Sequence, residues 1–382
     1  MQKSSSLLGR TVTVVLALCF FLVFSSALSF AGNTTPQLNN GKKWRIAYYQ
    51  GGPIPFYSHV QKEIIKKLMG YGWIEGGNLP EDGMTMEPPF WDWLCNTAKS
   101  DYLEFLPANG YSAFWNGEKR KEVRTELLKR LRDGEIDLVI AMGTWAGEDL
   151  VNESHSVPTL VLSATNFEET GLIKSMYDSG LEHVNVSIDP TFSERQVRMF
   201  HRVTDFKKLG VAYEDTPEGR RYSNIAVIDK IAAERGFEVN RCAVLDTTDD
   251  RAASRTSCLS CFQELAANSD AIYISALLCA DEQIDTLSAL FKDEGILSYS
   301  FYGSRHVEKG ILFGASSDAG YENYGGHNAE QMIQVLRGAS PRSLTQVVEL
   351  PFLLSINTAT ATAIDFKVPE SIRTIARDVY DH

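Results

Sequence analysis

Asp137-Leu-Val-Ile-Ala-Met142 holds an unbroken apolar run that passes directly into the turn Gly143-Thr-Trp-Ala-Gly147. An apolar run of this length predicts a strand buried on both faces, as the strands of parallel sheets are. Before it, the segment from Glu118 to Arg132 carries apolar residues at helical spacing. After it, Val157-Pro-Thr-Leu-Val-Leu162 predicts the next strand. This order of elements indicates a parallel sheet with helices packed on it.

The same units recur on both sides of this stretch. Arg45 to Gln50 predicts a first strand, and Ser58 to Tyr71 predicts a helix. A second set of strands is expected at residues 208–213, 238–245, 271–275 and 296–302. Its helices are expected at 221–235, 260–268, 284–294 and 321–336, with a last helix at 369–380. A chain this long exceeds one hydrophobic core, so the sequence predicts an α/β fold of two doubly wound parallel-sheet lobes.

Residues 85–118 depart from this pattern. Eight aromatic side chains fall between Phe90 and Trp115, and prolines and Gly110 interrupt any regular helix. We interpret the segment as an aromatic-rich insert in the first lobe. Its rings either form a local core, because a long insert must bury something, or build a wall over a cleft, and both roles stay open.

The first 31 residues have the pattern of a secretory signal peptide. A short basic start precedes an apolar run from Thr11 to Leu28, which ends in Ser29-Phe-Ala31. A permanent transmembrane anchor is the alternative, since the run is about long enough to span a bilayer. Small residues before Gly32 favour cleavage, which would leave 351 of the 382 residues in the periplasm.

The charge of the chain limits its partners. Removal of the signal peptide takes away two basic and no acidic residues, which changes the formal net charge from −12 to −14. Nucleic acids and anionic membrane surfaces require a basic face. We therefore expect neither as a partner.

The cysteines are only partly informative. Five remain after the expected cleavage, so at least one thiol is unpaired within the chain. Cys258-Leu-Ser-Cys261 has redox or zinc spacing, but no second Cys or His pair accompanies it. We interpret this pair as a small disulfide or as two buried thiols on a helix face. The pairing of Cys95, Cys242 and Cys279 stays open.

Motifs for catalysis and cofactor binding are absent from the sequence. It has no phosphate-binding G-x-x-x-x-G-K-S/T loop, no H-E-x-x-H and no G-x-S-x-G elbow. Its seven histidines form no metal-ligand spacing. We therefore expect a protein that is not an enzyme and that needs no cofactor and no metal.

Small polar turns follow the predicted strands and supply the candidate ligand contacts. In a parallel sheet such turns meet along one edge, where ligands bind and where helix N-termini present free N–H groups. Each turn alone is routine, but together they surround the expected opening between the lobes. The candidate residues are Tyr49, Gln50, Thr144, Trp145, Thr165, Asn166, Glu214, Ser275 and Asp318.

Several segments share motifs with one known family. They are Leu68-Met-Gly-Tyr-Gly-Trp-Ile-Glu-Gly-Gly-Asn78, Arg337-Gly-Ala-Ser-Pro341, the ending from Ile356 to Pro369, Ala164 to Leu172, and Asn185-Val-Ser187. These resemble the type I periplasmic binding proteins of ABC transporters, in the tryptophan/tyrosine-binding group. The likeness is collinear over almost the whole mature chain.

The resemblance implies both an organisation and a function. It places lobe one at residues 41–166 and 315–342 and lobe two at 185–310 and 345–382, joined by three crossings that act as a hinge. It implies a solute-binding protein that delivers a small organic ligand to a cognate ABC permease in the inner membrane. We expect this protein to be a monomer.

Roles for the candidate residues follow from this arrangement. Thr144 and Thr165 are expected to bind a polar head group, and Tyr49 and Trp145 to stack on an apolar body. Gln50 and Asn166 add amide groups at the same edge. We expect Glu214, Ser275 and Asp318 to set the orientation of the ligand from the other wall and the hinge.

Departures from the family leave the ligand open. Asn166-Phe167 stands where the family turn has Asp-Pro. The turn after the Ile272 strand, where an acid could meet a ligand ammonium, is Ser275-Ala-Leu-Leu-Cys279, and its first acid is delayed to Asp281. An amino acid and an aromatic or otherwise apolar carboxylate are equally compatible. A periplasmic sensor that signals to a membrane receptor and an exported α/β enzyme stay open as other functions.

Overall fold

We describe a computed structural model of the protein, which covers residues 34–80, 89–315 and 318–382. From Pro36 on, these residues form one compact unit, Pro36–His382. The predicted signal peptide, residues 1–31, lies outside the described residues. Within the described ranges, no helix is both long enough and apolar enough to cross a membrane.

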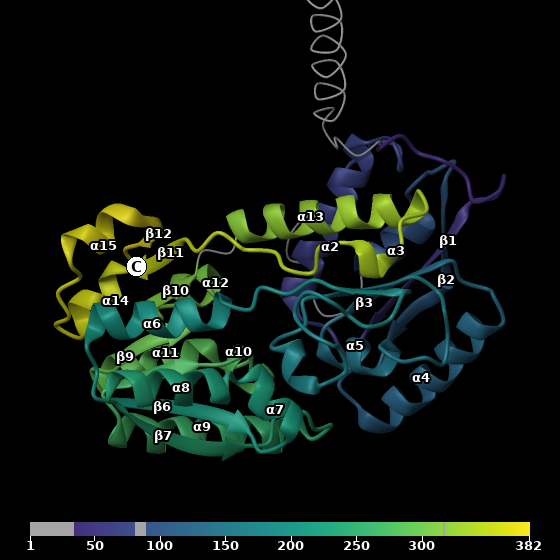
Figure 1. Ribbon diagram of the computed structural model, residues 1–382. Coiled ribbons are helices and arrows are strands. Elements are labelled where there is room, and N and C mark those ends of the chain that lie inside the picture. The colour runs from purple at the N-terminus through teal and green to yellow at the C-terminus, as the bar shows by residue number, and fades with distance from the viewer. Residues whose placement is uncertain (1–33, 81–88, 316–317) are drawn as a thin grey trace, which may run out of the picture. The chain divides into compact units, whose positions relative to one another are not determined.

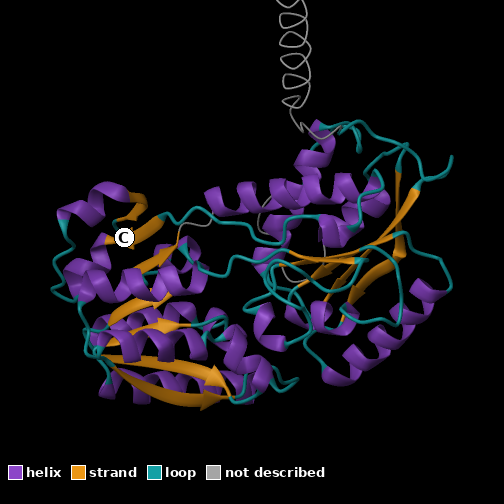
Figure 2. Cartoon of the chain, in the orientation of Figure 1, coloured by secondary structure: helices purple, strands orange, loops and turns teal. Residues whose placement is uncertain are grey.

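A five-stranded parallel sheet forms the first lobe (Figure 1, Figure 2). The strands, in the order β2-β1-β3-β4-β5 across the sheet, are β2 (Leu103–Ser112), β1 (Trp44–Gln50), β3 (Leu138–Met142), β4 (Thr159–Leu162) and β5 (Val184–Val186). β3, the apolar run before the turn at Gly143, lies at the centre, and each of its residues is buried. A strand covered on both faces needs apolar side chains in both directions, which explains why this run does not alternate.

Helices cover both faces of this sheet. Successive residues of β1 show the division, because Ile46 and Tyr48 pack in one cluster and Ala47 and Tyr49 in another. α2, α3 and α13 cover the first of these faces, and α4 and α5 cover the second. Their bounds are α2 (Pro55–Gly70), α3 (Pro89–Asn96), α4 (Gly117–Arg132), α5 (Thr144–Leu150) and α13 (Asp318–Leu336).

A seven-stranded sheet forms the second lobe. Its strands, in the order β12-β11-β10-β9-β8-β6-β7, are β12 (Ala376–Tyr380), β11 (Leu354–Asn357), β10 (Phe313–Ala315), β9 (Leu297–Ser300), β8 (Ala271–Ile274), β6 (Lys208–Glu214) and β7 (Glu238–Val244). Neighbouring strands are parallel except for β10 and β11. The second lobe is therefore also built mainly on a parallel sheet.

Helices again cover both faces. α6, α8 and α14 pack on one apolar cluster, and α9, α10 and α11 pack on the other. The helices of this lobe are α6 (Phe192–Thr204), α7 (Pro217–Tyr222), α8 (Ile225–Arg235), α9 (Arg251–Asn268), α10 (Leu278–Asp281), α11 (Ile284–Asp293), α12 (Ser304–Glu308), α14 (Thr358–Ala363) and α15 (Glu370–Ile375). Two clusters on opposite faces of one sheet are the mark of a doubly wound lobe.

Segments that cross between the lobes lie side by side. After β5, the N–H of Ile188 donates to the carbonyl oxygen of Gln346 at 2.8 Å, and the N–H of Val348 donates back to Ile188 at 2.9 Å. A third crossing runs from β10 to α13, and residues 316–317 within it lie outside the described part. The chain thus crosses between the sheets three times, and two of the crossings are hydrogen-bonded to each other.

The predicted start of lobe two at residue 185 falls within β5, which pairs with β4 in the first sheet. The polar residue Asn185 is tolerated in this buried strand because its amide donates to the carbonyl oxygens of Pro341 and Leu344. The first lobe therefore extends through Val186. A strand of three residues with a polar centre carries too weak an alternation to be recognised in the sequence.

The aromatic insert is more regular than predicted. It contributes α3 and the edge strand β2, which pairs in parallel with β1. Trp91 is buried, stacks on Tyr48 with ring centroids 6.1 Å apart, and donates to the carbonyl oxygen of Leu106 at 3.2 Å. Most of the insert therefore extends the core of the first lobe, which is the first of the two roles left open.

The prediction of one helix from Pro369 to Tyr380 is wrong in its second half. α15 ends at Ile375, and residues 376–380 form β12 beside β11. Ala-Arg-Asp-Val-Tyr alternates in exposure, as an edge strand does, and Ser355 donates to Asp378 across the pair at 2.7 Å. A segment of five residues is too short for its sequence pattern to distinguish a helix from a strand, and here the pairing with β11 decides.

Four cysteines form two disulfides in the second lobe, Cys242–Cys261 and Cys258–Cys279. The interpretation of Cys258 and Cys261 as partners of each other is wrong. Side chains three apart on a helix are separated by about 5–6 Å at Cβ, more than a disulfide spans, so each bonds to a neighbouring element instead. Cys95 is free.

Candidate ligand-binding cleft

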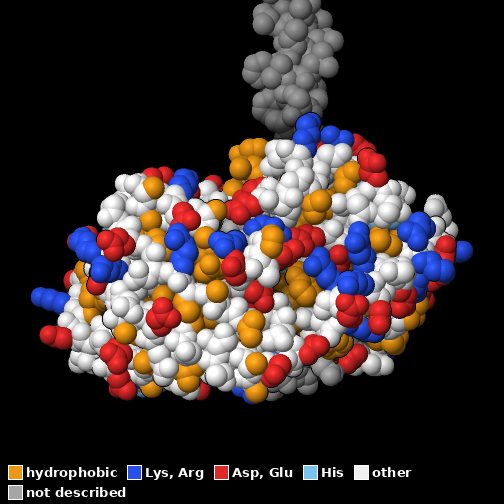
Figure 3. Space-filling view, turned by 90° about the horizontal axis from the view of Figure 1, so that it is seen from below, with side chains coloured by type: hydrophobic (Ala, Val, Ile, Leu, Met, Phe, Trp, Pro, Cys, Tyr) orange, Lys and Arg blue, Asp and Glu red, His pale blue; other side chains and the backbone are white. Residues whose placement is uncertain are grey.

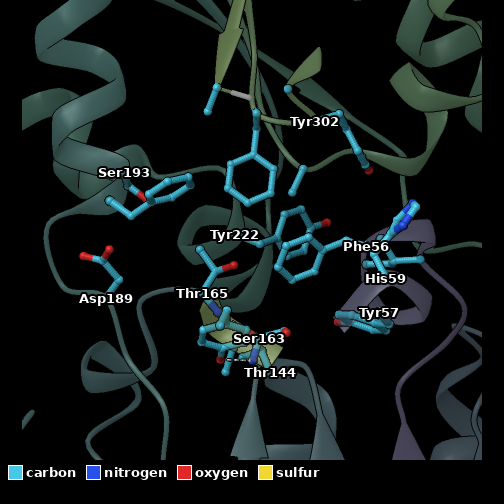
Figure 4. A pocket seen from close by; sticks show the side chains of 18 of the residues that line it. Phe56, Tyr57, His59, Thr144, Ser163, Thr165, Asp189, Ser193, Tyr222 and Tyr302 are labelled. Carbon is cyan, nitrogen blue, oxygen red and sulfur yellow. Dashed lines mark hydrogen bonds between the residues drawn. The ribbon is translucent and has the colours of Figure 1, made fainter. Parts of the chain in front are cut away.

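A cavity of about 430 Å³ lies between the two lobes. Its walls come from the turns after β3, β4 and β5 of the first sheet and after β7, β8 and β9 of the second, together with α2 and α13. Parallel strands present their carboxyl ends at a common edge, so both sheets aim their turns at this space. Figure 4 shows side chains from both lobes, among them Thr165 and Tyr222, converging on it.

Hydroxyl groups line the first-lobe side. Thr144, Ser163 and Thr165 lie close together at the ends of β3 and β4 (Figure 4). The N–H of Thr165 donates to Thr144 Oγ1 at 3.3 Å, and the N–H of Ser163 donates to Tyr324 Oη at 2.7 Å. The first bond joins the turns after β3 and β4, and the second attaches the turn after β4 to α13. Short polar side chains remain at this edge to meet a polar ligand group.

The side formed by α2 and α13 is aromatic. His59 stacks on Tyr321 with ring centroids 4.9 Å apart and planes 3° from parallel, and Phe56 meets Tyr321 edge-on at 5.1 Å. Tyr57 is buried beside them, and burial raises the pKa of its phenol, so the ring carries no charge at neutral pH. This side can accept an apolar or aromatic body.

Trp115 and Trp145 form a second aromatic corner. Their ring centroids lie 5.5 Å apart in an edge-to-face arrangement, and Trp115 Nε1 donates to the carbonyl oxygen of Pro53 at 3.2 Å. The guanidinium of Arg120 lies 4.6 Å from the ring centroid of Trp145. Trp115 is the aromatic of the insert that lines the cavity, so the insert contributes to the wall through this one described ring.

Glu214 organises the second-lobe wall from behind. It ends β6, and one of its carboxylate oxygens accepts from Tyr222 Oη at 2.7 Å. The other oxygen accepts from the N–H of Thr247 at 2.9 Å and from its Oγ1 at 2.8 Å. Because Tyr222 and Thr247 line the cavity and Glu214 does not, Glu214 orients the wall rather than meeting the ligand.

Asp246 is a buried acid among the residues that line the cavity. It follows β7, the parallel neighbour of β6, and its side chain accepts from the N–H groups of Leu278 at 3.1 Å and Cys279 at 2.8 Å. It is 1% exposed, and this burial raises the pKa of its carboxyl group to about 7. The turn after β8, where the sequence delays its first acid to Asp281, thus receives an acid from another strand.

The lobes also contact each other beside the cavity. Glu148 of α5 forms ion pairs with Arg120 of α4, at 3.0 Å, and with Arg221 of α7 in the other lobe. Asn116 donates to Asp249 across the lobes at 2.7 Å. A row of polar contacts therefore connects the lobes next to the candidate site.

Four of the nine candidate residues line this cavity. They are Thr144, Trp145, Thr165 and Asn166. Asn166 also donates to the carbonyl oxygen of Arg221 at 3.1 Å, which adds another contact between the lobes. The structure therefore brings together the candidates from the turns after β3 and β4.

Two candidates from β1 lie elsewhere. Tyr49 is fully buried on the opposite face of the sheet and donates to Asp149 at 2.6 Å. Gln50 is 3% exposed and accepts from Tyr48 Oη at 2.7 Å. Both belong to the strand itself rather than to the turn after it, so their side chains are used within the lobe and do not line the cavity.

Two second-lobe candidates are also set back from the cavity. Ser275 is fully buried and donates to the carbonyl oxygen of Ala212 at 3.0 Å, and Glu214 lies behind Thr247. Asp318 begins α13, and its side chain lies outside the described part of the structure. The two predicted contacts in the second lobe, Glu214 and Ser275, therefore support neighbouring residues and do not line the cavity.

Several lining residues were not predicted from the sequence. Phe56 and Tyr57 start α2, and Tyr302 follows β9, so all three occupy strand-to-helix turns of the kind used for prediction. Tyr222 and Tyr321 lie within helices and carry no such signal. Attention to every residue up to the first helical turn would have found the first group.

The described side chains include no group of three or more His, Cys, Asp and Glu arranged to hold a metal ion. On the face of the molecule in Figure 3, acidic and basic side chains are interspersed over the described surface. The polar and aromatic part of the cavity lining is made mainly of aromatic rings, hydroxyls and carboxyl groups, together with His59, Asn166 and Arg305.

Several solved structures resemble this fold. A conserved domain protein from Vibrio cholerae has a TM-score of 0.67 at 19% identity, with 88% of this chain and 100% of that chain covered. The ABC domain in complex with L-Trp from Streptococcus pneumonia has a TM-score of 0.66 at 18% identity, with 87% and 99% covered. A substrate-binding protein with adhesive properties from Clostridium difficile, ligand-free and open, has a TM-score of 0.59 at 16% identity, with 89% and 100% covered.

These similarities confirm the predicted fold class, two α/β lobes of the type I periplasmic binding protein kind. No curated protein matches the sequence. The family model described as ABC transporter substrate binding protein matches residues 108–380, a range that holds strands of both sheets and most of the cavity wall. This chain therefore belongs to the family of ABC transporter substrate-binding proteins.

Proposed function

We propose that the protein binds a small organic ligand in the cavity between its lobes and delivers it to a cognate ABC permease. The cavity itself supports this most strongly, because turns of both lobes line its volume of about 430 Å³. A ligand that contacts both walls stabilises the arrangement in which the lobes touch, which is how a binding protein converts binding into closure.

The lining supports a ligand with an apolar or aromatic body and a polar head. Rings from α2, α13 and the Trp115–Trp145 corner surround one part of the space, and the hydroxyls of Thr144 and Thr165 line another. A structural neighbour is in complex with L-Trp, a molecule of this kind. An amino acid falls within the proposed class.

The proposal includes a periplasmic location and a monomeric state. Export would depend on residues 1–31, and N-terminal sequencing of the native protein tests it, since an intact Met1 would contradict cleavage. A periplasmic carrier meets its permease from outside the inner membrane, and one chain supplies both lobes that line the cavity.

Native mass spectrometry of gently purified protein tests the proposed function. We expect a co-purified small molecule, whose removal increases the radius of gyration in small-angle scattering and whose return decreases it. Return of the molecule should also raise the melting temperature, because it binds only the folded chain. A confirmed ligand that changes neither quantity would contradict a protein that closes on its ligand.

Trp145→Ala is expected to weaken binding of that molecule by at least about tenfold, equivalent to about 1.4 kcal/mol. The ring forms a corner of the cavity with Trp115, and its removal takes away contact area from the ligand body. Isothermal titration calorimetry measures the affinity. Trp93→Ala is the matched control, because Trp93 packs on the first-lobe core and does not line the cavity. Equal affinities in the two variants would remove Trp145 from the binding site.

A further inference from the structure

We propose that Asp246 recognises a positively charged group of the ligand, so that the cavity takes an organic cation, such as a protonated amine on an aromatic or apolar body. This inference rests on the proposed function, because it concerns the same cavity. Beyond that function, we assign the charge of the ligand and the residue that binds the charged group.

The position of Asp246 is the first observation. Asp246 lines the cavity although only 1% of the residue is exposed, and two backbone N–H groups, of Leu278 and Cys279, hold its carboxyl group in place. The charge of this carboxyl group acts on the phenols of Tyr222 and Tyr302, which belong to the same wall. A carboxyl group taken out of water costs free energy unless a charge or hydrogen bonds compensate for it. The backbone bonds compensate in part, and a ligand cation in the cavity would supply the missing charge.

No described cation forms an ion pair with the side chain of Asp246. The nearby Arg251 donates to the main-chain oxygen of Asp246 and pairs with Glu282 at 3.0 Å. Arg305, a cation of the cavity lining, is paired with Asp281. The basic groups around the site are therefore engaged with other acids.

Other carboxylates around the cavity add to the excess of negative over positive charge. Glu218 and Glu308 line it and form no ion pair within the described ranges, whereas Asp189 is paired with Arg195 at 2.6 Å. Glu214 lies behind the wall and adds a further negative charge close to Asp246. A ligand whose only charge is negative would meet repulsion on this side of the cavity.

Aromatic rings beside Asp246 suit a cation as well. Tyr222 and Tyr302 line the same wall, and Figure 4 shows both side chains directed into the cavity. The faces of aromatic rings attract ammonium groups. The hydroxyl oxygen of Tyr302 is buried and has no hydrogen-bond partner in the described structure, so it offers an acceptor to an ammonium N–H.

The charge of Asp246 makes binding depend on pH. Burial, with a smaller contribution from Glu214, raises the pKa of its carboxyl group to about 7, although the N–H groups of Cys279 and Leu278 and the charge of Arg251 oppose the rise. Tyr222 and Tyr302 also face it, but burial raises the pKa of both phenols, so they stay neutral. A cation prefers the ionised carboxylate, and the ionised fraction grows with pH. The affinity for an amine should therefore rise about tenfold between pH 6 and pH 8.

The experiment compares pairs of probes that share a body and differ in charge. Tryptamine and indole-3-propionate form one pair, phenethylamine and 3-phenylpropionate another, and L-tryptophan carries both charges. Thermal shift and calorimetry with the full mature chain are expected to show binding of the amines and of L-tryptophan, with at least tenfold weaker binding of the two carboxylates. Amine affinity should increase from pH 6 to pH 8.

Asp246→Asn is expected to reduce amine affinity at least tenfold and to remove the pH dependence. Glu238→Gln is the matched control, since Glu238 begins β7 at the end opposite Asp246, is exposed and does not line the cavity. It should leave the amine affinity and its pH dependence unchanged within about twofold. The pH profile of the natural protein keeps the proposal testable if Asp246→Asn is unstable. Carboxylates that bind as well as amines, or amine affinity that is independent of pH, would overturn the cation assignment. Closure on such a carboxylate would leave the proposed function intact.

Discussion

Replacing the four bridged cysteines by alanine is expected to lower the free energy of unfolding of the second lobe by about 6 kcal/mol, about 3 for each disulfide. Cys242–Cys261 joins residues 19 apart in sequence and Cys258–Cys279 joins residues 21 apart. Each bridge restricts the unfolded chain by closing a loop of this length. Together they connect β7, α9 and α10, the elements that carry Asp246 and its backbone donors.

The tryptophans allow this effect to be measured lobe by lobe. All six lie between Trp44 and Trp145, so their fluorescence reports the first lobe, whereas far-UV circular dichroism reports both. In urea, the variant should lose circular dichroism at lower concentration than it loses native fluorescence. Cys95→Ala is the control, because Cys95 is a free thiol, and it should shift neither transition appreciably. A four-cysteine variant as stable as the natural protein would show that the bridges contribute nothing to folding.

Gly143→Ala is expected to lower the free energy of unfolding by about 3 kcal/mol and to weaken ligand binding as well. Gly143 has a φ of +86° and a ψ of 173°, a conformation that is essentially limited to glycine and costs an L-residue about 1–3 kcal/mol. An added Cβ would lie 2.0 Å from the Oη of the buried Tyr57, so that ring must move at a cost of about 1–3 kcal/mol. Thr144 and Tyr57 both line the cavity, so the displacement reaches the site.

Gly134→Ala separates the two contributions. Gly134 has a φ of +68°, and an added Cβ there would meet nothing within 4 Å. This variant should therefore lose only the conformational part, about 1 kcal/mol, and keep its affinity. Urea unfolding and calorimetry on both variants measure the difference. If Gly143→Ala loses no more stability than Gly134→Ala and keeps its affinity, the Tyr57 ring can move away from the new Cβ at no cost. That result would contradict the predicted clash.

Much of the fold could be predicted because parallel sheets leave a clear pattern in the sequence. The runs that became β3, β4 and β8 are buried on both faces, so almost every residue in them is apolar. β5 and β12 were missed or misassigned. Both are short strands whose side chains include polar groups satisfied by distant partners, and those partners are invisible along the chain.

The site was less predictable, for a physical reason that Asp246 illustrates. It reaches the turn after β8 from the end of β7, because those strands flank β6 in the sheet. Within the segment that follows β8, the first acid is Asp281, so the sequence of that segment does not indicate Asp246. Thr144 and Thr165 were found because each stands in the turn that its own strand delivers to the sheet edge. Residues from helices, such as Tyr222, enter the wall through packing that strand order alone does not give.

The ion pair between Glu148 and Arg221 has a consequence for transport. It joins the lobes through the protein's own side chains, and both are largely shielded from water, with 13% and 14% exposed. Salt therefore screens this attraction only weakly. Any opening of the lobes must separate these two opposite charges, so the contact adds to the work of releasing whatever the cavity holds.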